Sequence, residues 1–308
     1  MGRVPRPGER LSTSALPAPG ADPSDAAREL AERYGLEPSS HRPALGEYMS
    51  QIWARRYFIL SFAQARMTTM YSQARLGQLW QILTPLLNAA VYYFVFGKVL
   101  GTHKSIPNYI GFLVTGVMIF TFINRSITNG AKTIPTNLSL IRALHFPRAC
   151  MPLATVLVEF QQMLLSMVVL IVIVLLSGEP ITLHWLMLLP TLVFLTMFSS
   201  GMTMFIARLG ANLPDVSQLL PFILRTWLYL SGVFYNIDSQ TFTKNKPILG
   251  DILYANPATV YIELARASLL HHSDLRPHTW AWAAFWAFLA VIVGFLFFWR
   301  GEHSYGRG

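Results

Sequence analysis

Glu159 and Arg225 are ionisable residues that stand inside long apolar stretches of this chain. Glu159 lies about eight residues into the stretch 151–177, and Arg225 lies about eight residues into the stretch 217–237. If both stretches cross a membrane from the same side, a rise of 1.5 Å per residue puts both side chains roughly 12 Å deep. A charge there costs about 2.5 to 3.5 kcal/mol, so it usually pairs or faces water. We expect Glu159 and Arg225 to pair with each other or to line a polar conduit; the alternative is that they snorkel to an interface.

Aromatic residues are dense in the apolar stretches 79–99 and 217–237. Sugar rings present flat C–H faces to aromatic rings, so a channel lined by aromatic residues would suit a glycan. Aromatic belts at the membrane surface and contacts with lipid are the alternative role for the same residues. The residues that we predict to line a channel are Tyr92, Phe96, Glu159, Arg225, Trp227 and Tyr229.

The chain lacks the sequence patterns of common catalytic and nucleotide sites. It has no Gly-x-x-x-x-Gly-Lys-Ser/Thr phosphate loop and no His-Glu-x-x-His metal motif. His271 and His272 are adjacent but have no carboxylate partners at ligand spacing, and the loop 100–107 has no carboxylate for glycosyl transfer. We therefore predict no catalytic residue, no metal site and no cofactor bound by this chain itself.

Six apolar stretches must position these residues, and each reaches the roughly 20 residues that a helix needs to cross a bilayer. Hydrophobic residues make up 53% of the chain and charged residues 13%, against about 25% charged residues in soluble domains. We predict an all-α integral membrane protein with six transmembrane helices, a soluble helix bundle being the alternative. Within the fourth stretch, the small residues Ser199-Ser200-Gly201 favour close helix packing. The six predicted spans are 79–99, 108–128, 151–177, 184–208, 217–237 and 280–299.

The basic residues predict the orientation of these helices. Lysine and arginine cluster before the first span and between the second and third spans, which places both segments in the cytoplasm under the positive-inside rule. The net charge of +9 is therefore a sign of topology and not of nucleic-acid binding. We predict a multi-pass protein of the plasma (inner) membrane with cytoplasmic N- and C-termini. The basic loop 238–279 goes against this assignment, but it is long enough for the rule to weaken.

Two segments precede the spans. Residues 1–44 are rich in Pro, Gly, Ala and Arg, and we predict a disordered cytoplasmic tail. In residues 45–78 apolar side chains recur at helical spacing, which predicts an amphipathic helix on the inner membrane surface. The predicted transmembrane domain follows over residues 79–308. A soluble helix packed on the tail is the alternative. An interface helix would meet membrane lipids, and its candidate contact residues are Trp53, Arg55, Arg56 and Arg66.

Two loops are predicted to carry helices of their own. Between the second and third spans, Pro135 and Asn137 can start a short helix through Leu144, which would form a docking knob on the cytoplasmic side. In the fifth loop, residues 251–270 show helical periodicity interrupted by charges and by Pro257. We expect two short re-entrant helices there, dipping into the outer leaflet before the last span. A flexible surface loop is the alternative.

Two segments resemble parts of one known family. Arg75-Leu-Gly-Gln-Leu-Trp80, leading through Pro85 to Tyr93-Phe-Val-Phe-Gly97, resembles the approach to the first span in type 2 ATP-binding-cassette (ABC) permeases. The members that it resembles export polysaccharides and include the O-antigen and teichoic-acid exporters. The segment 137–152, with an asparagine-leucine start and a Phe-Pro-Arg turn, is similar to the cytoplasmic coupling segment of these permeases.

A third segment, Tyr254-Ala-Asn-Pro257 followed by Glu263 and Arg266, is similar to the outer gate of that family. The resemblance covers residues 45–303 and implies a homodimer around a central channel. It also implies two separate cytoplasmic ATPase subunits, which would bind ATP and Mg, and a lipid-linked polysaccharide as substrate. The Ala, Pro, Gly and Arg-rich tail suggests an actinobacterial source, in which the lipid-linked galactan exporter of the cell wall would be the matching member.

The resemblance also assigns residues to roles. The predicted contacts to the ATPase are Asn137, Leu138, Leu140, Ile141, Arg142, His145, Phe146, Pro147 and Arg148. The predicted outer gate comprises Tyr254, Asn256, Pro257, Glu263 and Arg266. The chain departs from the family at Asn212-Leu-Pro-Asp215, where proline stands in place of the usual arginine before the aspartate. Asp215 is still expected to cap the start of the fifth span.

Two other functions fit an integral membrane chain. A drug or small-lipid exporter of the same permease class would share the architecture, but those members typically have a larger outer domain and lack the Phe-Pro-Arg pattern. A stand-alone membrane enzyme acting on lipid-linked sugars would need carboxylates on an outer loop. Activity without a partner ATPase would favour the enzyme.

Overall fold

The computed structural model describes residues 44–72, 79–99, 101, 106–144, 146–237, 247–271 and 275–302. Every regular element in these ranges is a helix, so the all-α prediction is confirmed for this part of the chain. The predicted disordered tail lies outside the described residues apart from Ala44. Residues 73–78 of the predicted interface helix and His145 of the predicted ATPase contacts lie outside them as well.

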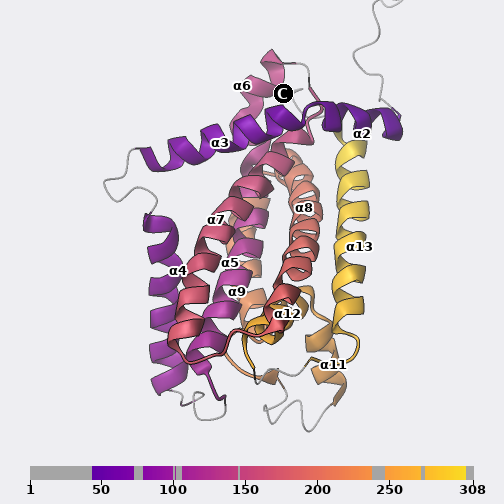
Figure 1. The fold of residues 1–308 in the computed structure, drawn as a ribbon. Helices are drawn as coiled ribbons and strands as arrows, with labels where there is room; N and C mark the ends of the chain where they lie inside the picture. Colours follow the sequence, from indigo (N-terminus) through magenta and orange to yellow (C-terminus); the bar gives the residue numbers. More distant parts are fainter. Residues whose placement is uncertain are drawn as a thin grey trace, which may run out of the picture. The chain divides into compact units, whose positions relative to one another are not determined.

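Four long helices run between the two ends of the bundle drawn in Figure 1. They are α5 (Tyr109–Thr133), α7 (Cys150–Leu176), α8 (Leu188–Asn212) and α13 (Thr279–Arg300). Each is long and apolar enough to cross a membrane, α8 together with the 3₁₀ turn η5 (Leu183–Met187) that precedes it. Four of the six predicted spans are thus confirmed as helices of spanning length.

The other two predicted spans are helical but shorter or irregular. The first consists of α4 (Leu79–Tyr92), which continues as the π-helix η2 (Tyr93–Val99). The fifth is α9 (Val216–Leu230), which has 15 residues and ends just before Gly232. Gly232 has a φ of +60°, a left-handed conformation that commonly ends helices. The predicted span 217–237 is therefore too long as a helix, and six crossings of the membrane stay a prediction.

Helices α8 and α13 pack with their backbones in contact. A Cβ atom on Gly201 of α8 would overlap the backbone carbonyl of Ala290 on α13, and a Cβ atom on Gly294 would overlap the carbonyl of Gly201. Ala283 and Ala287 of α13 are also fully buried. Lipid tails are as apolar as the helices, so close van der Waals packing of this kind is what holds helices together in a membrane. The close packing expected around Ser199-Ser200-Gly201 is confirmed at Gly201.

Helices α2 (Leu45–Ala54) and α3 (Arg56–Ser72) lie across one end of the bundle (Figure 1). The single interface helix that we predicted is therefore broken, and the break is a turn at Arg55. Tyr48 of α2 and Ala63 of α3 are buried in apolar clusters with residues of the bundle. Leu60 of α3, by contrast, is 49% exposed. The two helices thus cover the bundle with one face and present apolar side chains on another, as helices at a membrane surface do.

Short helices occur at both ends of the bundle. Helix α6 (Leu138–Ala143), with the 3₁₀ turn η4 (Pro135–Asn137) before it, lies at the same end as α2 and α3. At the opposite end are α11 (Pro247–Ala255) and α12 (Pro257–Leu269). Both predictions of short helices are confirmed, and the alternative of a flexible loop is wrong for these residues. Helix α12 is buried against α5, α8 and α13.

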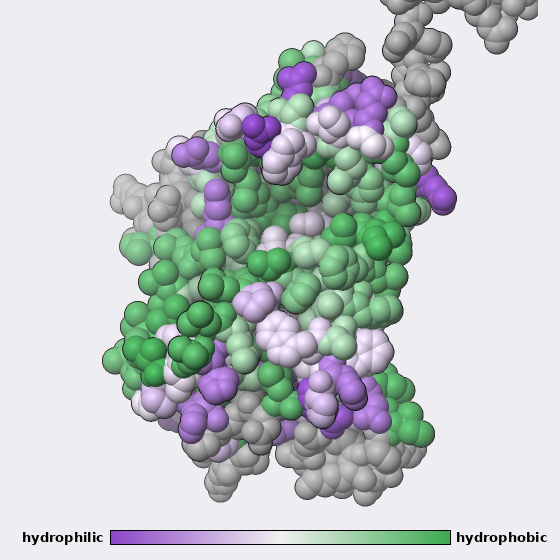
Figure 2. Space-filling model, turned by 45° about the vertical axis from the view of Figure 1, so that its right-hand side comes forward, coloured by the Kyte–Doolittle hydropathy of each residue, from purple (hydrophilic) through white to green (hydrophobic). Residues whose placement is uncertain are grey.

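The outer surface of the bundle is hydrophobic between its two ends. On the face drawn in Figure 2, hydrophobic residues form a band, and polar residues gather above and below it. Among the exposed apolar side chains are Leu189 and Val193 of α8 and Ile292 of α13, each more than half exposed. A band of this kind is expected where helices face the hydrocarbon layer of a bilayer.

Candidate functional site

The Phe-Pro-Arg turn of the predicted coupling segment is anchored inside the protein. The backbone N–H of Arg148 donates to Glu302 Oε1 over 2.9 Å, and the Arg148 guanidinium donates to the Glu302 carbonyl oxygen. The next backbone N–H, of Ala149, donates to the Tyr48 hydroxyl over 3.2 Å. We call Tyr48, Arg148, Ala149 and Glu302 the clamp, because they join α2, the start of α7 and the end of α13.

Phe146 and Pro147 reinforce this anchoring. The Phe146 ring lies 5.0 Å from the ring of Phe58 on α3, and Pro147 is buried. Phe146, Pro147 and Arg148 therefore attach the segment to its own protein, and they present little surface to a docking partner.

The rest of the predicted coupling segment divides into anchors and exposed residues. Ile141 is buried, and Leu138 and Leu140 pack against the same apolar cluster. The Asn137 amide donates to the Thr133 carbonyl over 2.7 Å and so satisfies the last turn of α5. Two further residues are exposed and give α6 an outward surface: Arg142, and its neighbour Leu144, which is 48% exposed.

Replacing Glu302 with glutamine is expected to flatten the pH dependence of stability at the clamp. Burial raises the pKa of Glu302 above its usual range, although the N–H of Arg148 opposes this. The folded chain therefore binds more protons than the unfolded chain above the ordinary carboxyl pKa, so the contribution of Glu302 to stability falls as pH rises through its raised pKa. Glutamine keeps the acceptor oxygen and has no proton to lose.

The measurement is thermal unfolding of the purified full-length chain and of the Glu302→Gln variant between about pH 5 and about pH 8. Wild-type Tm should decline with rising pH more steeply than the Tm of the variant. Equal slopes would show that Glu302 does not titrate differently in the folded chain.

The predicted interface residues lie in different surroundings. Arg55 is exposed at the break between α2 and α3. The Arg56 guanidinium lies over the rings of Trp53 and Tyr57, at 5.4 and 4.5 Å from their centroids. Arg66 turns toward the bundle, where its Nη1 atom is buried without a hydrogen-bond partner.

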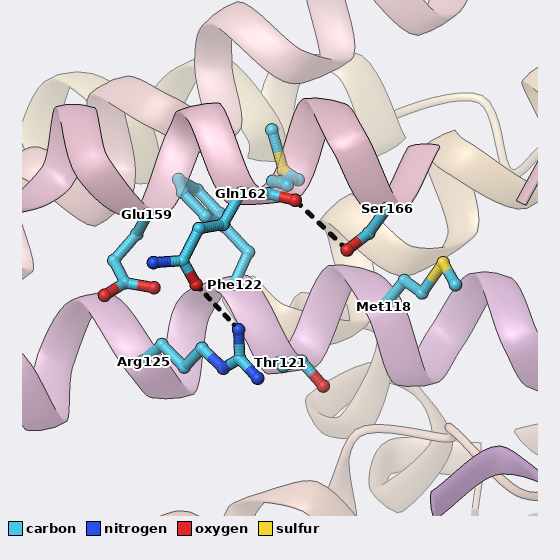
Figure 3. A pocket seen from close by; sticks show the side chains of 8 residues that line it. Met118, Thr121, Phe122, Arg125, Glu159, Gln162 and Ser166 are labelled. Atoms are coloured by element: carbon cyan, nitrogen blue, oxygen red, sulfur yellow. Dashed lines mark hydrogen bonds between the residues drawn. The ribbon is translucent and has the colours of Figure 1, made fainter. Parts of the chain in front are cut away.

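A cluster of polar side chains lies between α3, α5 and α7, and we call it the membrane polar cluster: Arg66, Arg125, Asn129, Glu159 and Gln162. Glu159 is 3% exposed and accepts a hydrogen bond of 2.6 Å from the Asn129 amide. Arg125 Nη1 donates to Gln162 Oε1 over 2.9 Å, as Figure 3 shows. Arg125 and Arg66 are the cations that interact with the Glu159 carboxylate.

The structure corrects the expected pairing of Glu159 with Arg225. Glu159 lies beside Asn129 and Arg125, whereas Arg225 is exposed on α9 and interacts with Tyr92. Arg125, the partner that the sequence reasoning missed, stands well inside the stretch from which α5 forms. An ionisable residue within a predicted span is itself the signal that could have identified it. A buried charge in this position needs such a partner because desolvation is costly.

The predicted channel aromatics gather at the opposite end of the bundle from α2 and α3. Phe234 is fully buried, and the rings of Phe96, Tyr92 and Tyr229 lie 4.4, 4.7 and 5.6 Å from its centroid. These rings come from the first and fifth predicted spans and from the turn after α9. Trp227 lies apart from them, and its indole N–H donates to Asn256 Oδ1 over 2.7 Å. Three of the six predicted channel residues, Tyr92, Phe96 and Tyr229, thus lie near the junction of α4, η2 and α9.

Asn256 and Pro257 of the predicted outer gate shape the corner between α11 and α12. Asn256 is the N-cap of α12 and accepts from the Ala258 N–H over 3.1 Å, with Pro257 at the first helical position. Tyr254 lies under the guanidinium of Arg276, which is 3.6 Å from the ring centroid. The corner is therefore held by capping and by the contact of Trp227 with Asn256.

Arg266 is the most deeply buried residue of the predicted gate, with no exposed surface. Its guanidinium donates to the carbonyls of Phe112, Gly232 and Val233 over 3.1, 3.0 and 2.9 Å. It also forms a 2.8 Å ion pair with Glu263. One side chain thus joins α12, α5 and the turn after α9.

Asp215 does not cap α9 with its side chain. It occupies the N-cap position but has helical backbone angles, and its carboxylate makes no capping hydrogen bond. Capping side chains usually extend from a β-region backbone, which is why the expected cap fails here. Its backbone carbonyl accepts instead from the N–H groups of Gln218 and Leu219.

Comparison with known proteins identifies the family of this chain. Residues 57–270 match the family model described as ABC-2 type transporter. The chain is 28% identical over 169 residues to an O-antigen export system permease protein RfbA of Klebsiella pneumoniae, and the match covers 54% of this chain and 64% of that protein. It is 26% identical over 206 residues to the polysialic acid transport protein KpsM of Escherichia coli, and this match covers 66% of this chain and 77% of that protein.

A similar protein of Myxococcus xanthus, also an O-antigen export system permease protein RfbA, is 24% identical over 190 residues, covering 61% of this chain and 72% of its own length. The chain spans less than two thirds of the Klebsiella relative. The family model, by contrast, covers well over half of this chain and includes the polar cluster, α6 and α12. The chain therefore belongs to the ABC-2 type transporter family.

Proposed function

We propose that this chain is the non-catalytic permease subunit of an ATP-driven exporter that moves a lipid-linked polysaccharide out of the cytoplasm. Two copies would form the channel in the plasma membrane, and two separate ATPase subunits would bind ATP and Mg. The names of the relatives support this proposal, because they are permease and transport proteins for O-antigen and polysialic acid. The N- and C-termini would be cytoplasmic, which puts α2, α3 and α6 on the ATPase side.

The clamp is the observation that carries the proposal. An ATPase that pushes on α6 can move a substrate only if the push reaches the helices that cross the membrane. The clamp joins the loop after α6 to both α2 and the end of α13 through three hydrogen bonds. Phe146 and Phe58 add a contact to α3, so a load applied to α6 would be transmitted to the first and last elements of the bundle.

The exposed face of α9 supports a channel between two copies. Leu219 and Phe222 are 58% and 73% exposed, and Arg225 is exposed on the same helix. An arginine in lipid is costly, but an arginine that faces a water-filled path is not. We therefore propose that α9 and α4 face the second copy and that Arg225 meets the substrate there. A lipid-linked galactan is the polysaccharide to try first.

Replacing Leu144 with aspartate is expected to release the ATPase subunit. Leu144 is 48% exposed at the end of α6 and lies outside the clamp. A buried unpaired carboxylate at a contact should weaken binding by on the order of tenfold or more, which corresponds to about 1.4 kcal/mol. The measurement is the amount of ATPase subunit that co-purifies with the full-length chain from native membranes, together with ATP-dependent export.

Leu213 provides a matched control, since it is a leucine that is 57% exposed in the loop between α8 and α9 at the same end of the molecule. Leu213→Asp should retain the ATPase. Equal retention by both variants would exclude α6 as the docking contact. A wild-type chain that purifies alone and acts on lipid-linked sugars without ATP would favour the stand-alone membrane enzyme instead.

A further inference from the structure

A large apolar groove lies below α2, on the outer surface of the bundle. Its volume is about 600 Å³, and residues from α2, α7, α8 and α13 line it. Met49 and Ile52 of α2 form its roof, and Val193 of α8 and Phe295 of α13 lie on its walls. The hollow is visible on the face drawn in Figure 2, among the hydrophobic residues below the polar end.

The lining of the groove excludes a polar ligand. Its hydroxyl groups belong to Thr196 and Ser200, and each already donates to a backbone carbonyl one turn earlier in α8. The rest of the lining is aliphatic, aromatic or methionine. An occupant therefore gains from burial of hydrocarbon and not from hydrogen bonds.

The groove has the dimensions of a hydrocarbon chain. Along α8 its lining residues extend from Leu189 to Met204, a distance of roughly 22 Å at 1.5 Å per residue. Met204 belongs to the apolar cluster around Tyr48 and Phe298, so this end of the groove lies beside α2. One leaflet of a bilayer has about 15 Å of hydrocarbon, so a lipid chain entering beside α2 fits along the groove.

Two arginines follow the part of α2 that lines the groove. Arg56 is the first residue of α3, four positions after the groove residue Ile52, and the exposed Arg55 stands at the turn between the two helices. Inside the chain Arg56 donates to the Trp53 carbonyl and to the Tyr57 hydroxyl. A guanidinium has five N–H donors, so others are available for the oxygen atoms of a phosphate. Trp53, which is 70% exposed beside it, is a typical residue of the headgroup level.

We propose that this groove is a binding site for one anionic phospholipid of the inner leaflet, with an acyl chain under α2 and the phosphate at Arg56. Basic residues next to a membrane surface attract anionic lipids in particular, which is why the proposal commits to this class. The bound acyl chain would fill the space between α2 and the bundle. This inference goes beyond the proposed export function: it rests on that proposal only for the cytoplasmic placement of α2, and it does not depend on the identity of the exported substrate.

Photo-crosslinking tests the proposal on the full-length chain. The probe is phosphatidylglycerol with a photoreactive group on its acyl chain, in vesicles of phosphatidylglycerol and phosphatidylcholine. Crosslinks are expected on α8 around Thr196, and competition with unlabelled phosphatidylglycerol should remove them. Val193→Trp fills the groove and should reduce this labelling by on the order of tenfold, because displacing even two CH₂ groups from an apolar site has that effect.

Val168→Trp is the matched control. Val168 and Val193 are both 59% exposed, on α7 and α8, and Val168 does not line the groove. The control should label as the wild type does. Equal labelling of both tryptophan variants would overturn the proposal, and so would labelling of α8 that unlabelled phosphatidylglycerol does not reduce.

Arg56→Gln tests the phosphate contact with a surface substitution that does not threaten folding. Its labelling by phosphatidylglycerol should fall about fivefold, the effect of one basic residue near an anionic surface. Labelling by an equivalent phosphatidylcholine probe should fall less, because the choline cation offsets the charge of its phosphate. An unchanged preference for phosphatidylglycerol would overturn the assignment of the headgroup to Arg56.

Discussion

Replacing Gly201 with leucine should abolish the folded protein, and even Gly201→Ala should cost on the order of 3 kcal/mol, at the upper end of what overpacking costs. The first methyl group already overlaps the Ala290 carbonyl, and that atom belongs to the backbone of α13 and cannot rotate away. The two helices would have to separate. Because van der Waals contact is the main attraction between helices in lipid, separation removes the interaction that joins α8 and α13.

The measurement is the yield of monodisperse full-length chain in detergent and its Tm. Gly46 is the control, because it is a helical glycine of α2 where an added Cβ atom would meet no other atom within 4 Å. Gly46→Ala should keep or slightly raise the Tm, since alanine is the better helix former. Similar yields and Tm values for Gly201→Ala and Gly46→Ala would contradict the close contact of α8 with α13.

Replacing Arg266 with leucine should destabilise the chain by about 3 to 5 kcal/mol, the usual cost of breaking a buried charge pair. Leucine leaves three backbone carbonyls without their donor and leaves Glu263 without its cation. The turn after α9 would then lose its attachment to α12. Lysine should rescue only part of the loss, since its three donors radiate from one atom and cannot reproduce the planar fork.

Arg276→Leu is the control for Arg266→Leu. Arg276 pairs with Asp251 over 3.1 Å, but both side chains are well exposed. Exposed pairs contribute about 1 kcal/mol or less. Thermal unfolding of the three Arg266 and Arg276 variants beside the wild type gives the comparison. If Arg266→Leu were as stable as Arg276→Leu, the guanidinium would not be holding α12, α5 and α9 together.

The strongest patterns in the sequence predicted the fold well. Long apolar stretches identified α5, α7, α8 and α13, because length and hydropathy are enough to define a membrane helix. Proline and asparagine located α6 and α12, because both residues favour helix starts. The break at Arg55 was not predictable, since no proline or glycine marks it.

Contacts between residues that are far apart in the sequence could not be predicted from the sequence. The pairing of Arg148 with Glu302 joins residues 154 positions apart, and nothing in the local pattern of either residue indicates the other. The predicted depth in the membrane suggested Arg225 as the partner of Glu159, because opposite charges at the same depth attract each other. The partner of Glu159 depends instead on which faces of α5 and α7 pack together. The observed packing brings Asn129 and Arg125 next to Glu159.

The clamp also sets an order of events during synthesis. Tyr48 is among the first described residues to leave the ribosome, and Glu302 is the last of them. Because domains form as the chain emerges, α2 and α6 must wait while every membrane helix is made and inserted. The end of the molecule that contains α2 and α6 is therefore completed only when α13 is in place, so a truncated or misinserted chain lacks a finished surface at that end.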